Sequence, residues 1–478
     1  MNYKWIALSN TTIGTLMASL DRNIVIIALP TIAHELHASL LTLVWIAIGY
    51  WVVTASVLLN FGRLADMFGR VKLYNIGFAL FTIGSTLCSM SQTGEQLIVF
   101  RAIQALGAAF LFSNSAAILT DAFPEMERGR ALGLNQMAIV VGSVIGLAFG
   151  GFLTSYLGWR SIFWINIPIG IFATVWSYTE LQELGTIRKE KIDWLGNATL
   201  SGGLLFLLIG ITFGAFQIID LFEISLFVIG GSSLLTLFYF IEKKVSKPMF
   251  DLSLFKLRLF TGGNIAIFLN SLARGSFSLV MAFYLQGPSM KLSPLNAGVY
   301  LIPVSLALAI FAPISGWLYD RYKLQIFTPL GLLISATGFL ILTRISAITS
   351  FYETILPLAL VGAGMGIFAS PNRAMIMSSV PSYRRGVAAG ISTTLVMAGS
   401  AFSIGLVFLI FTQTMPLHAT QNIFTGSFVA VSNITIAMIV NKFMNSLHFI
   451  FFISAILMLV SIVPSIMKWT YVKKKSKY

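Results

Sequence analysis

Asp21 is the residue of this chain best placed to do chemistry, because it stands inside an apolar stretch that runs from Ile6 to Pro30. A charge near the middle of a membrane helix costs on the order of 3 kcal/mol or more, so such a group needs a polar cavity or a partner. Burial favours the neutral form of a carboxyl group, whereas a nearby cation such as Arg22 favours the charged form. A carboxyl held between these effects can take up a proton on one side of a membrane and release it on the other. A purely structural ion pair with Arg22 or another arginine is the alternative.

The composition is that of a membrane protein. Of the 478 residues, 57% are hydrophobic and only 10% are charged, and the mean hydropathy is +0.86. Soluble globular proteins carry roughly 25% charged residues. One cysteine, Cys88, excludes an intramolecular disulfide and a cysteine-rich metal site.

Fourteen apolar segments are long enough to cross a bilayer, since a helical span needs about 20 residues. Their predicted limits are 6–30, 42–62, 73–91, 96–120, 131–157, 161–178, 195–214, 221–240, 262–285, 295–317, 326–345, 354–376, 386–412 and 446–467. The runs are continuous rather than alternating, which argues against a β-barrel. Because the backbone must satisfy its own hydrogen bonds in lipid, we predict an all-α integral membrane protein with 14 transmembrane helices.

The basic residues predict the orientation of these helices. With 14 spans both termini lie on one side, and that side collects 23 of the 31 lysines and arginines, against four in the opposite loops. The remaining four are arginines inside spans: Arg22, Arg101, Arg274 and Arg373. We therefore expect a multi-pass protein of the cell membrane with both termini in the cytoplasm. The same distribution accounts for the net charge of +14 without nucleic acid.

The chain contains an internal repeat. The pattern Gly62-x-Leu-x-Asp66 returns as Gly316-x-Leu-x-Asp320 after 254 residues, and six further residues return at an offset of 257. We predict two homologous six-helix halves, residues 1–180 and 261–478, separated by two additional helices within 181–260. A long outer loop is expected at 413–445. Six-helix halves of this kind are a transporter architecture that binds substrate between the halves at the midplane.

The repeat draws attention to Arg274, at the centre of the ninth segment. Adding the 254-residue offset to Asp21 gives position 275, one residue away. Aligned without a gap, Asp21 and Arg274 stand at near-equivalent depths and face one cavity. We hypothesise that they pair in one conformation and separate in another, or that Arg274 binds an anionic substrate group. Burial of Arg274 against segment 10 or 13 is the alternative.

Five motifs are distributed along the chain: Leu20-Asp21-x-x-Ile-Val-x-x-Ala-Leu-Pro30, Gly62-Arg-Leu-Ala-Asp66-Met-Phe-Gly69-Arg70, Arg101-Ala-Ile-Gln104-Ala-Leu-Gly107, Trp159-Arg160-x-x-Phe163-x-x-Asn166-x-Pro168-x-Gly170, and Tyr284-Leu-Gln286 followed by Ser293-Pro294-x-x-Ala297-Gly298. Together they resemble motifs of the major facilitator superfamily, in its 14-helix drug:proton antiporter branch. The resemblance covers nearly the whole chain. It implies the major facilitator fold, and it implies a role for Arg101 beside Asp21 in proton coupling. An arginine that fastens helices together through backbone carbonyls is the alternative for Arg101.

The resemblance also implies a cytoplasmic gate that latches the two halves and breaks as the protein reopens. Its residues would be Gly62, Asp66, Gly69, Arg70, Arg130, Asp320 and Arg321. A solvated turn is the alternative, and it is the stronger one for Asp320, because the second copy of the motif has lost its Gly-Arg ending.

Two departures from the family pattern stand out. The helix 5 motif of antiporters ends in Gly-Pro, but Gly146 is followed by Leu147, so the kink that a proline introduces is absent. The glycine face of Gly142, Gly146 and Gly150 remains, and its four-residue spacing allows close helix packing. The threonine usually found two residues after the helix 1 aspartate is replaced by Asn23.

Polar residues within the spans predict a substrate cavity. The candidates are Asp21, Asn23, Gln104, Asn114, Gln136, Asn270 and Arg274, with Asn372 as a further polar group. Gln104 lies one turn after Arg101 and can share a hydrogen-bond network with it. Apolar walls with few polar anchors suit amphiphilic compounds.

The function that follows is secondary active transport. We expect export of hydrophobic or amphiphilic compounds by proton antiport with alternating access. An exporter of a specific metabolite or organic anion is the alternative, and a passive facilitator or channel is a weaker one. The sequence has no Walker motif, histidine cluster or paired carboxylate in the spans, so we expect no enzyme, no cofactor and no metal site. The expected partners are a small-molecule substrate, protons and the lipid bilayer, with no nucleic acid, and the chain is expected to be a monomer.

Overall fold

The computed structural model describes residues 3–124, 127–185, 193–245, 248, 250–322, 324–381, 384–416, 423 and 433–466. All regular structure within these ranges is helical. The chain divides into two compact units. The first comprises Met1–Leu207 and Val228–Phe250, and the second comprises Leu208–Phe227 and Asp251–Tyr478.

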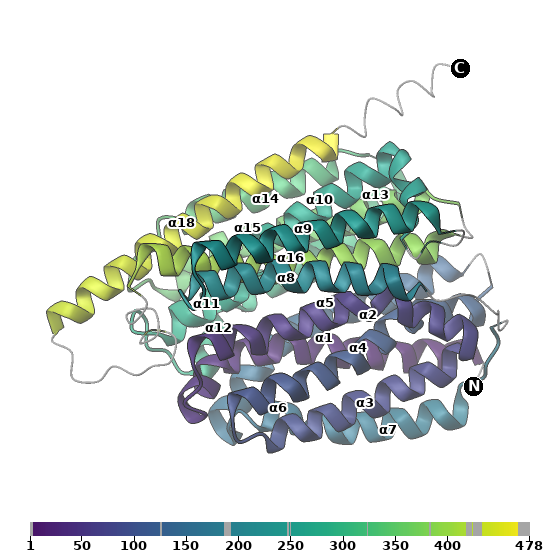
Figure 1. Ribbon diagram of the computed structural model, residues 1–478, viewed down its shortest axis with the longest axis horizontal. Coiled ribbons are helices and arrows are strands. Elements are labelled where there is room, and N and C mark those ends of the chain that lie inside the picture. The colour runs from purple at the N-terminus through teal and green to yellow at the C-terminus, as the bar shows by residue number, and fades with distance from the viewer. Residues whose placement is uncertain are drawn as a thin grey trace. The chain divides into compact units, whose positions relative to one another are not determined.

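The first part of the chain forms α1 (Tyr3–Glu35), α2 (Leu40–Phe68), α3 (Arg70–Met90), α4 (Gly94–Ala122), α5 (Arg128–Leu157), α6 (Ser161–Trp164) and α7 (Asn166–Glu180). Two further long helices follow, α8 (Trp194–Ala215) and α9 (Leu221–Lys244). The remainder forms η1 (Leu252–Lys256), α10 (Arg258–Arg274), α11 (Phe277–Gln286), α12 (Pro294–Tyr300), α13 (Ile302–Tyr322), α14 (Phe327–Leu342), α15 (Phe351–Ser378), α16 (Arg385–Thr414) and α18 (Asn433–Ile466). Figure 1 shows the long helices of the first unit, α1 to α5 and α7, as rods lying side by side.

The apolar segments expected from the sequence appear as helices. In the described part of the chain, 13 helical stretches are long and apolar enough to cross a membrane, and α14 is a shorter apolar helix of 16 residues. Three predicted spans are broken: the sixth at Ile165, the ninth at Gly275 and Ser276, and the tenth at Leu301. Within the range 413–445, where a long loop is predicted, α16 ends at Thr414 and α18 begins at Asn433. The division into 1–180, 181–260 and 261–478 stays a prediction.

Local side-chain caps fix where several helices begin. Ser39 accepts the amide hydrogen of Thr42 at 3.1 Å at the start of α2. Ser350 and Glu353 form a reciprocal capping box at the start of α15. Such caps satisfy amide groups that the first turn of a helix leaves without partners. The chain turns from α2 into α3 at Gly69, whose φ of +105° favours glycine.

Close backbone contacts at glycines hold the first unit together. A β-carbon on Gly84 of α3 would lie 2.6 Å from the Cα of Gln104 on α4. A β-carbon on Gly142 of α5 would lie 2.8 Å from the carbonyl oxygen of Leu16 on α1. Small residues let the backbones of membrane helices approach closely, and this approach stabilises their packing. These contacts bring α1, α3, α4 and α5 close enough for short polar side chains to meet.

Candidate functional site

Asp21 lies inside the first unit and has no exposed surface. Its Oδ2 accepts a hydrogen bond of 2.5 Å from Nη1 of Arg101 on α4. Its Oδ1 accepts two hydrogen bonds of 2.9 Å, one from Nε2 of Gln104 and one from Nδ2 of Asn166. The carboxylate therefore bridges α1, α4 and the first residue of α7.

Gln104 links the ion pair to α3. Its Oε1 accepts a second hydrogen bond from Nη1 of Arg101 at 2.7 Å, and its Nε2 donates to Oγ of Ser85 at 2.7 Å. The Sγ of Cys88 lies 4.0 Å from the same Oε1. Ser85, Cys88 and Gln104 are each fully buried. The ion pair is thus held by neutral polar groups and shielded from solvent.

Aromatic rings surround the arginine. The guanidinium of Arg101 lies 4.4 Å from the ring centroid of Tyr50 and 6.0 Å from that of Phe163. The Tyr50 hydroxyl donates to the carbonyl oxygen of Ala18 at 3.3 Å, which fixes the ring against α1. The Nε of Arg101 is buried and has no hydrogen-bond partner in the described part of the chain. Cation–π contacts and the Asp21 carboxylate therefore supply most of its stabilisation.

The break between α6 and α7 places Asn166. Segment 6 is interrupted at Ile165, so that Asn166 becomes the first residue of α7. Its side chain is 1% exposed and points to Asp21. Helix α5 packs on α1 at the same level: Gly146 and Gly150 approach Leu20 and Ile24 so closely that β-carbons on the glycines would each lie 2.7 Å from α1 atoms. Helix α1 is thereby held between contacts with α7 and α5 at the level of the Asp21 carboxylate.

A second charged cluster lies at the ends of helices in the same unit. Arg70 contacts Asp66 at 2.7 Å, and its Nη1 donates to both carboxylate oxygens of Asp121 at 2.7 Å. Glu183 accepts the backbone amide hydrogens of Arg70 at 3.0 Å and Val71 at 2.8 Å. A carboxylate at the start of α3 is favoured by the helix dipole. The cluster ties the α2–α3 turn to α4 and to the segment after α7.

Comparison with known proteins identifies the family. Residues 11–404 match the profile of the Major Facilitator Superfamily. The chain belongs to the major facilitator superfamily. Members of this superfamily are transporters rather than enzymes, so the expectation of transport is confirmed at that level.

Curated members of the superfamily align along most of their length. The chain is 32% identical to the riboflavin transporter RibZ of Clostridioides difficile (strain 630), over 91% of this chain and 94% of that protein. It is 29% identical to the multidrug transporter protein MdtP of Bacillus subtilis (strain 168), over 82% and 72%. It is 27% identical to the tetracenomycin C resistance and export protein of Streptomyces glaucescens, over 83% and 74%.

Solved structures share the fold. A bacterial homolog of the human lysosomal transporter Spinster, in an inward-facing and unoccupied conformation, matches with a TM-score of 0.66 at 15% identity, over 98% of both chains. The POT family transporter PepTSo matches with a TM-score of 0.65 at 15% identity, also over 98% of both chains. The predicted major facilitator fold is confirmed.

The residues of the predicted gate lie in different surroundings. In the first unit, Asp66 and Arg70 form the ion pair described above, and Gly62 has open space where a β-carbon would stand. Arg130 belongs to α5, but its side chain lies outside the described part of the structure. In the second unit, Arg321 lies 5.5 Å from the ring centroid of Trp317 near the end of α13, one residue after Asp320. The gate stays a prediction.

Two further predicted cavity residues of the first unit bond to carbonyl groups of their own helices, and Asn23 also donates to Oγ of Ser143 on α5 at 3.2 Å. Asn114 donates to the carbonyl oxygen of Phe110 at 2.8 Å, and Asn23 donates to that of Ser19 at 3.0 Å. The side chain of Gln136 lies outside the described part of the structure. Its neighbour Asn135 is buried.

Asn135 belongs to a polar triad that sequence reasoning missed. Its Oδ1 accepts from Ser115 at 3.0 Å, its Nδ2 donates to Thr15 at 3.2 Å, and the two hydroxyls lie 3.1 Å apart. The triad joins α5, α4 and α1. It places polar groups on the same helices that hold the ion pair.

In the second unit, Arg274 is the last residue of α10 and donates from Nε to Oδ1 of Asn270 at 3.0 Å. Asn270 in turn donates to the Sδ of Met458 on α18 at 3.2 Å. Asn372 of α15 donates to the carbonyl oxygen of Gly263 on α10 at 3.1 Å. The hypothesis that Asp21 and Arg274 pair in one conformation stays a prediction.

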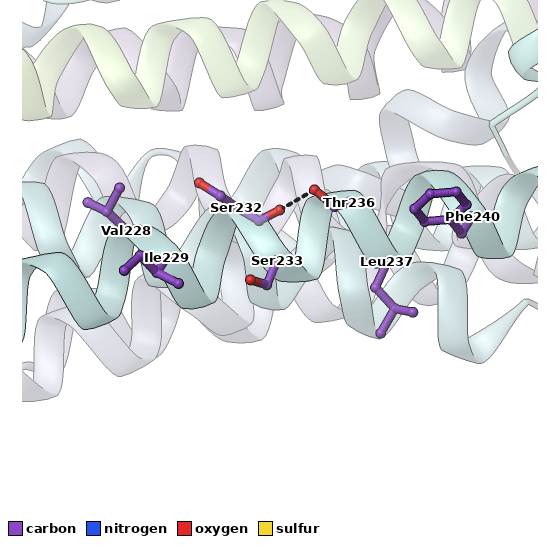
Figure 2. A pocket seen from close by; sticks show the side chains of 7 residues that line it. All are labelled: Val228, Ile229, Ser232, Ser233, Thr236, Leu237 and Phe240. Atoms are coloured by element: carbon purple, nitrogen blue, oxygen red, sulfur yellow. Dashed lines mark hydrogen bonds between the residues drawn. The ribbon is translucent and has the colours of Figure 1, made fainter.

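Two shallow hollows lie in the first unit. One, of about 480 Å³, is lined by apolar residues of α1 and α7, and Asn166 is the polar residue among its described lining. The other, of about 500 Å³, lies along α9, where Figure 2 shows Thr236 bonded to the carbonyl oxygen of Ser232 between aliphatic side chains. Only the first touches the Asp21 network, through the Asn166 amide. In the described part of the chain no cluster of three or more histidine, cysteine or acidic residues forms a metal site.

Proposed function

We propose that this protein is a proton-coupled exporter of amphiphilic compounds, with Asp21 as the group that carries the proton. The observation that supports this most is the Asp21–Arg101 ion pair, because both side chains are sealed inside a membrane-spanning bundle. A single carboxylate in such a place changes the local charge completely when it binds a proton. Arg101 is the positioning cation of the site, and Gln104 and Asn166 orient the carboxylate.

The ion pair is suited to a two-state cycle. While Asp21 is charged, it accepts hydrogen bonds from Arg101 and Gln104 of α4 and from Asn166 of α7. These bonds hold α4 and α7 against α1. Protonation removes the charge that holds Arg101, and a buried arginine without a counter-charge is costly. The unit then favours an arrangement in which Arg101 finds other partners or water. In transporters with repeated halves, alternating access proceeds by rocking of one half against the other about a fixed site. A change in the Asp21–Arg101 pair could bias that motion.

The proton supplies the driving energy. Moving one elementary charge inward down the membrane potential yields about 2.3 kcal/mol per 100 mV. Antiport therefore requires that Asp21 be protonated from the outside and deprotonated towards the cytoplasm. We place both termini in the cytoplasm of a cell membrane, on the basis of the 23-to-4 distribution of basic residues.

The cluster at Arg70 is the proposed gate on the same side. Asp66 and Asp121 hold the guanidinium, and Glu183 holds the start of α3. These carboxylates are partly exposed, so their ion pairs are weaker than the Asp21 pair and can open within the cycle. We propose that the cluster breaks and reforms as the cytoplasmic side opens and closes.

Export of drug-like compounds is favoured by the names of two similar proteins, a multidrug transporter and an export protein for tetracenomycin C. The second candidate is transport of one specific metabolite or organic anion. It is favoured by similarity to a riboflavin transporter and by the intramembrane Arg274. The protein is proposed to act as a monomer.

The proposal can be tested in inverted membrane vesicles that contain the full chain. Fluorescent amphiphiles of both charges, and riboflavin, are offered outside while the vesicle interior is acidified. We expect the vesicles to accumulate the compound against its concentration gradient. This accumulation should stop when a protonophore is added. Equilibration without accumulation, unaffected by the protonophore, would instead indicate a passive facilitator or channel. Asp220→Asn removes the same charge from an exposed position before α9 and is the control for Asp21→Asn. Its uptake should equal that of the wild type.

A further inference from the structure

The charges inside the membrane do not balance. Away from their ends, the predicted spans hold four arginines, Arg22, Arg101, Arg274 and Arg373, and one carboxylate, Asp21, whereas Glu223 and Arg344 stand within three residues of a span end. That carboxylate is fully buried and already accepts hydrogen bonds from Arg101, Gln104 and Asn166. The excess of positive charge means that the spans, as folded here, attract an anion rather than a cation.

Arg274 stands where its helix is interrupted. It is the last residue of α10, and α11 begins only at Phe277. The break is supported by α16, because Oγ of Ser403 accepts the amide hydrogen of Ser276 at 3.0 Å and Gly275 lies against Ser400. The C-terminal end of a helix favours a cation, and interrupted membrane helices are where transporters hold charged substrates. Arg274 therefore lies at a helix break that contacts with α16 stabilise.

The contacts of Arg274 are neutral. Its Nε donates to Asn270, whose side chain is itself anchored on Met458. Of the five N–H groups of the guanidinium, only this one has a partner among the described residues.

The carboxylates of the second unit lie at helix ends. Asp251 pairs with Arg384, Glu353 caps α15, Asp220 and Glu223 cap the start of α9, and Asp320 stands in the last turn of α13. No described carboxylate of the unit lies within 4.0 Å of Arg274. Among the described residues nothing occupies its remaining donors, so they can bind an anion.

A lipid headgroup cannot supply that anion. Arg274 lies twelve residues before the end of α11, or about 18 Å along a helix, and sixteen residues after the start of α10, or about 24 Å. An arginine side chain is too short to reach the interface from this depth. The anion must therefore come with a compound that enters the protein.

We propose that Arg274 binds an anionic group of the transported compound, and that Asn270 holds the guanidinium in place. The inference rests on the proposed export function and narrows it to amphiphilic organic anions, such as compounds with a carboxylate, sulfonate or acidic phenol. A planar guanidinium suits these groups because it can donate two parallel hydrogen bonds.

The test is equilibrium binding to the purified full-length protein in a neutral detergent. The probes are fluorescein, an anion, and rhodamine 123, a cation with the same xanthene ring system. We expect fluorescein to bind more tightly than rhodamine 123. Arg274→Gln should weaken fluorescein binding at least about tenfold and leave rhodamine 123 binding unchanged or tighter, since a charge-assisted hydrogen bond is lost. Arg274→Lys keeps the positive charge but loses the two parallel hydrogen bonds, so its fluorescein affinity should fall between those of the wild type and Arg274→Gln.

The matched control is Arg344→Gln, which removes the same charge from an exposed position after α14. The melting temperature of each variant shows whether it has folded. The proposal is overturned if the wild-type protein binds rhodamine 123 more tightly than fluorescein, if it binds neither probe, or if Arg274→Gln binds fluorescein as tightly as the wild type does. Binding needs no proton gradient, so the two proposals can fail separately. Absence of coupled transport in vesicles would contradict the proposed function, whereas the anion-binding role of Arg274 is decided by the binding measurement alone.

Discussion

The Asp21–Arg101 pair allows structural and functional roles to be separated by one set of variants. Both side chains are sealed, with 0% of the aspartate and 3% of the arginine side chain exposed. Removing one partner of a buried ion pair costs about 3–5 kcal/mol, because the other charge is left without a counter-charge. We therefore expect Asp21→Asn and Arg101→Gln each to destabilise the protein by about that amount.

The double variant Asp21→Asn/Arg101→Gln leaves no unpaired charge. It should be less destabilised than the sum of the single variants, with a coupling energy of several kcal/mol. Transport should behave differently, because no group remains to carry the proton. Pump activity driven by a pH gradient should be absent in Asp21→Asn and should not return in the double variant.

The free energies can be measured by reversible unfolding in mixed detergent micelles. A surface pair, Lys4 with Glu127, is the control, since its side chains are 22% and 46% exposed. Glu127→Gln should cost no more than about 1 kcal/mol. If the losses of unfolding free energy in the two single variants simply add in the double variant, the predicted coupling energy between Asp21 and Arg101 is refuted. Gradient-driven transport by the double variant would refute the proton role of Asp21.

Two other variants probe the support of the site. Asn166→Leu removes one hydrogen bond that favours the charged carboxylate. Since such a bond contributes about 1.5–3 kcal/mol and one pH unit corresponds to about 1.4 kcal/mol, the pH midpoint of transport should rise by about one to two units, and an unchanged midpoint would exclude this role. Gly146→Ala would place a β-carbon 2.7 Å from the carbonyl oxygen of Leu20 and should cost about 1–3 kcal/mol, whereas Gly133→Ala on the same helix meets open space and should be neutral or stabilising. Equal melting temperatures for the two alanine variants would contradict the packing argument.

The helices could be predicted from the sequence because apolar length determines which segments can span a membrane. Their interruptions could not. The break after Arg274 is stabilised by the hydroxyl of Ser403, more than one hundred residues away, and a hydropathy pattern carries no record of that contact. The start of α18 at Asn433 was missed for a related reason, since the residues before 446 include polar ones that broke the apolar pattern.

The charged members of the site were also predictable, because Asp21 and Arg101 are conspicuous in apolar surroundings and Gln104 follows at helical spacing. Ser85 and Asn166 were missed as site residues, since a neutral side chain in a span has many possible partners. Asn166 did stand in the motif that begins at Trp159, and that position was the available signal.

The most direct test of the account is proton movement driven by the transported compound in inverted vesicles. A pH-sensitive dye inside pre-acidified vesicles reports proton efflux when the compound is added outside. We predict efflux with the wild-type protein and none above the protein-free rate with Asp21→Asn, although the variant still binds the compound. Efflux from Asp21→Asn vesicles equal to that of the wild type would show that another group carries the proton.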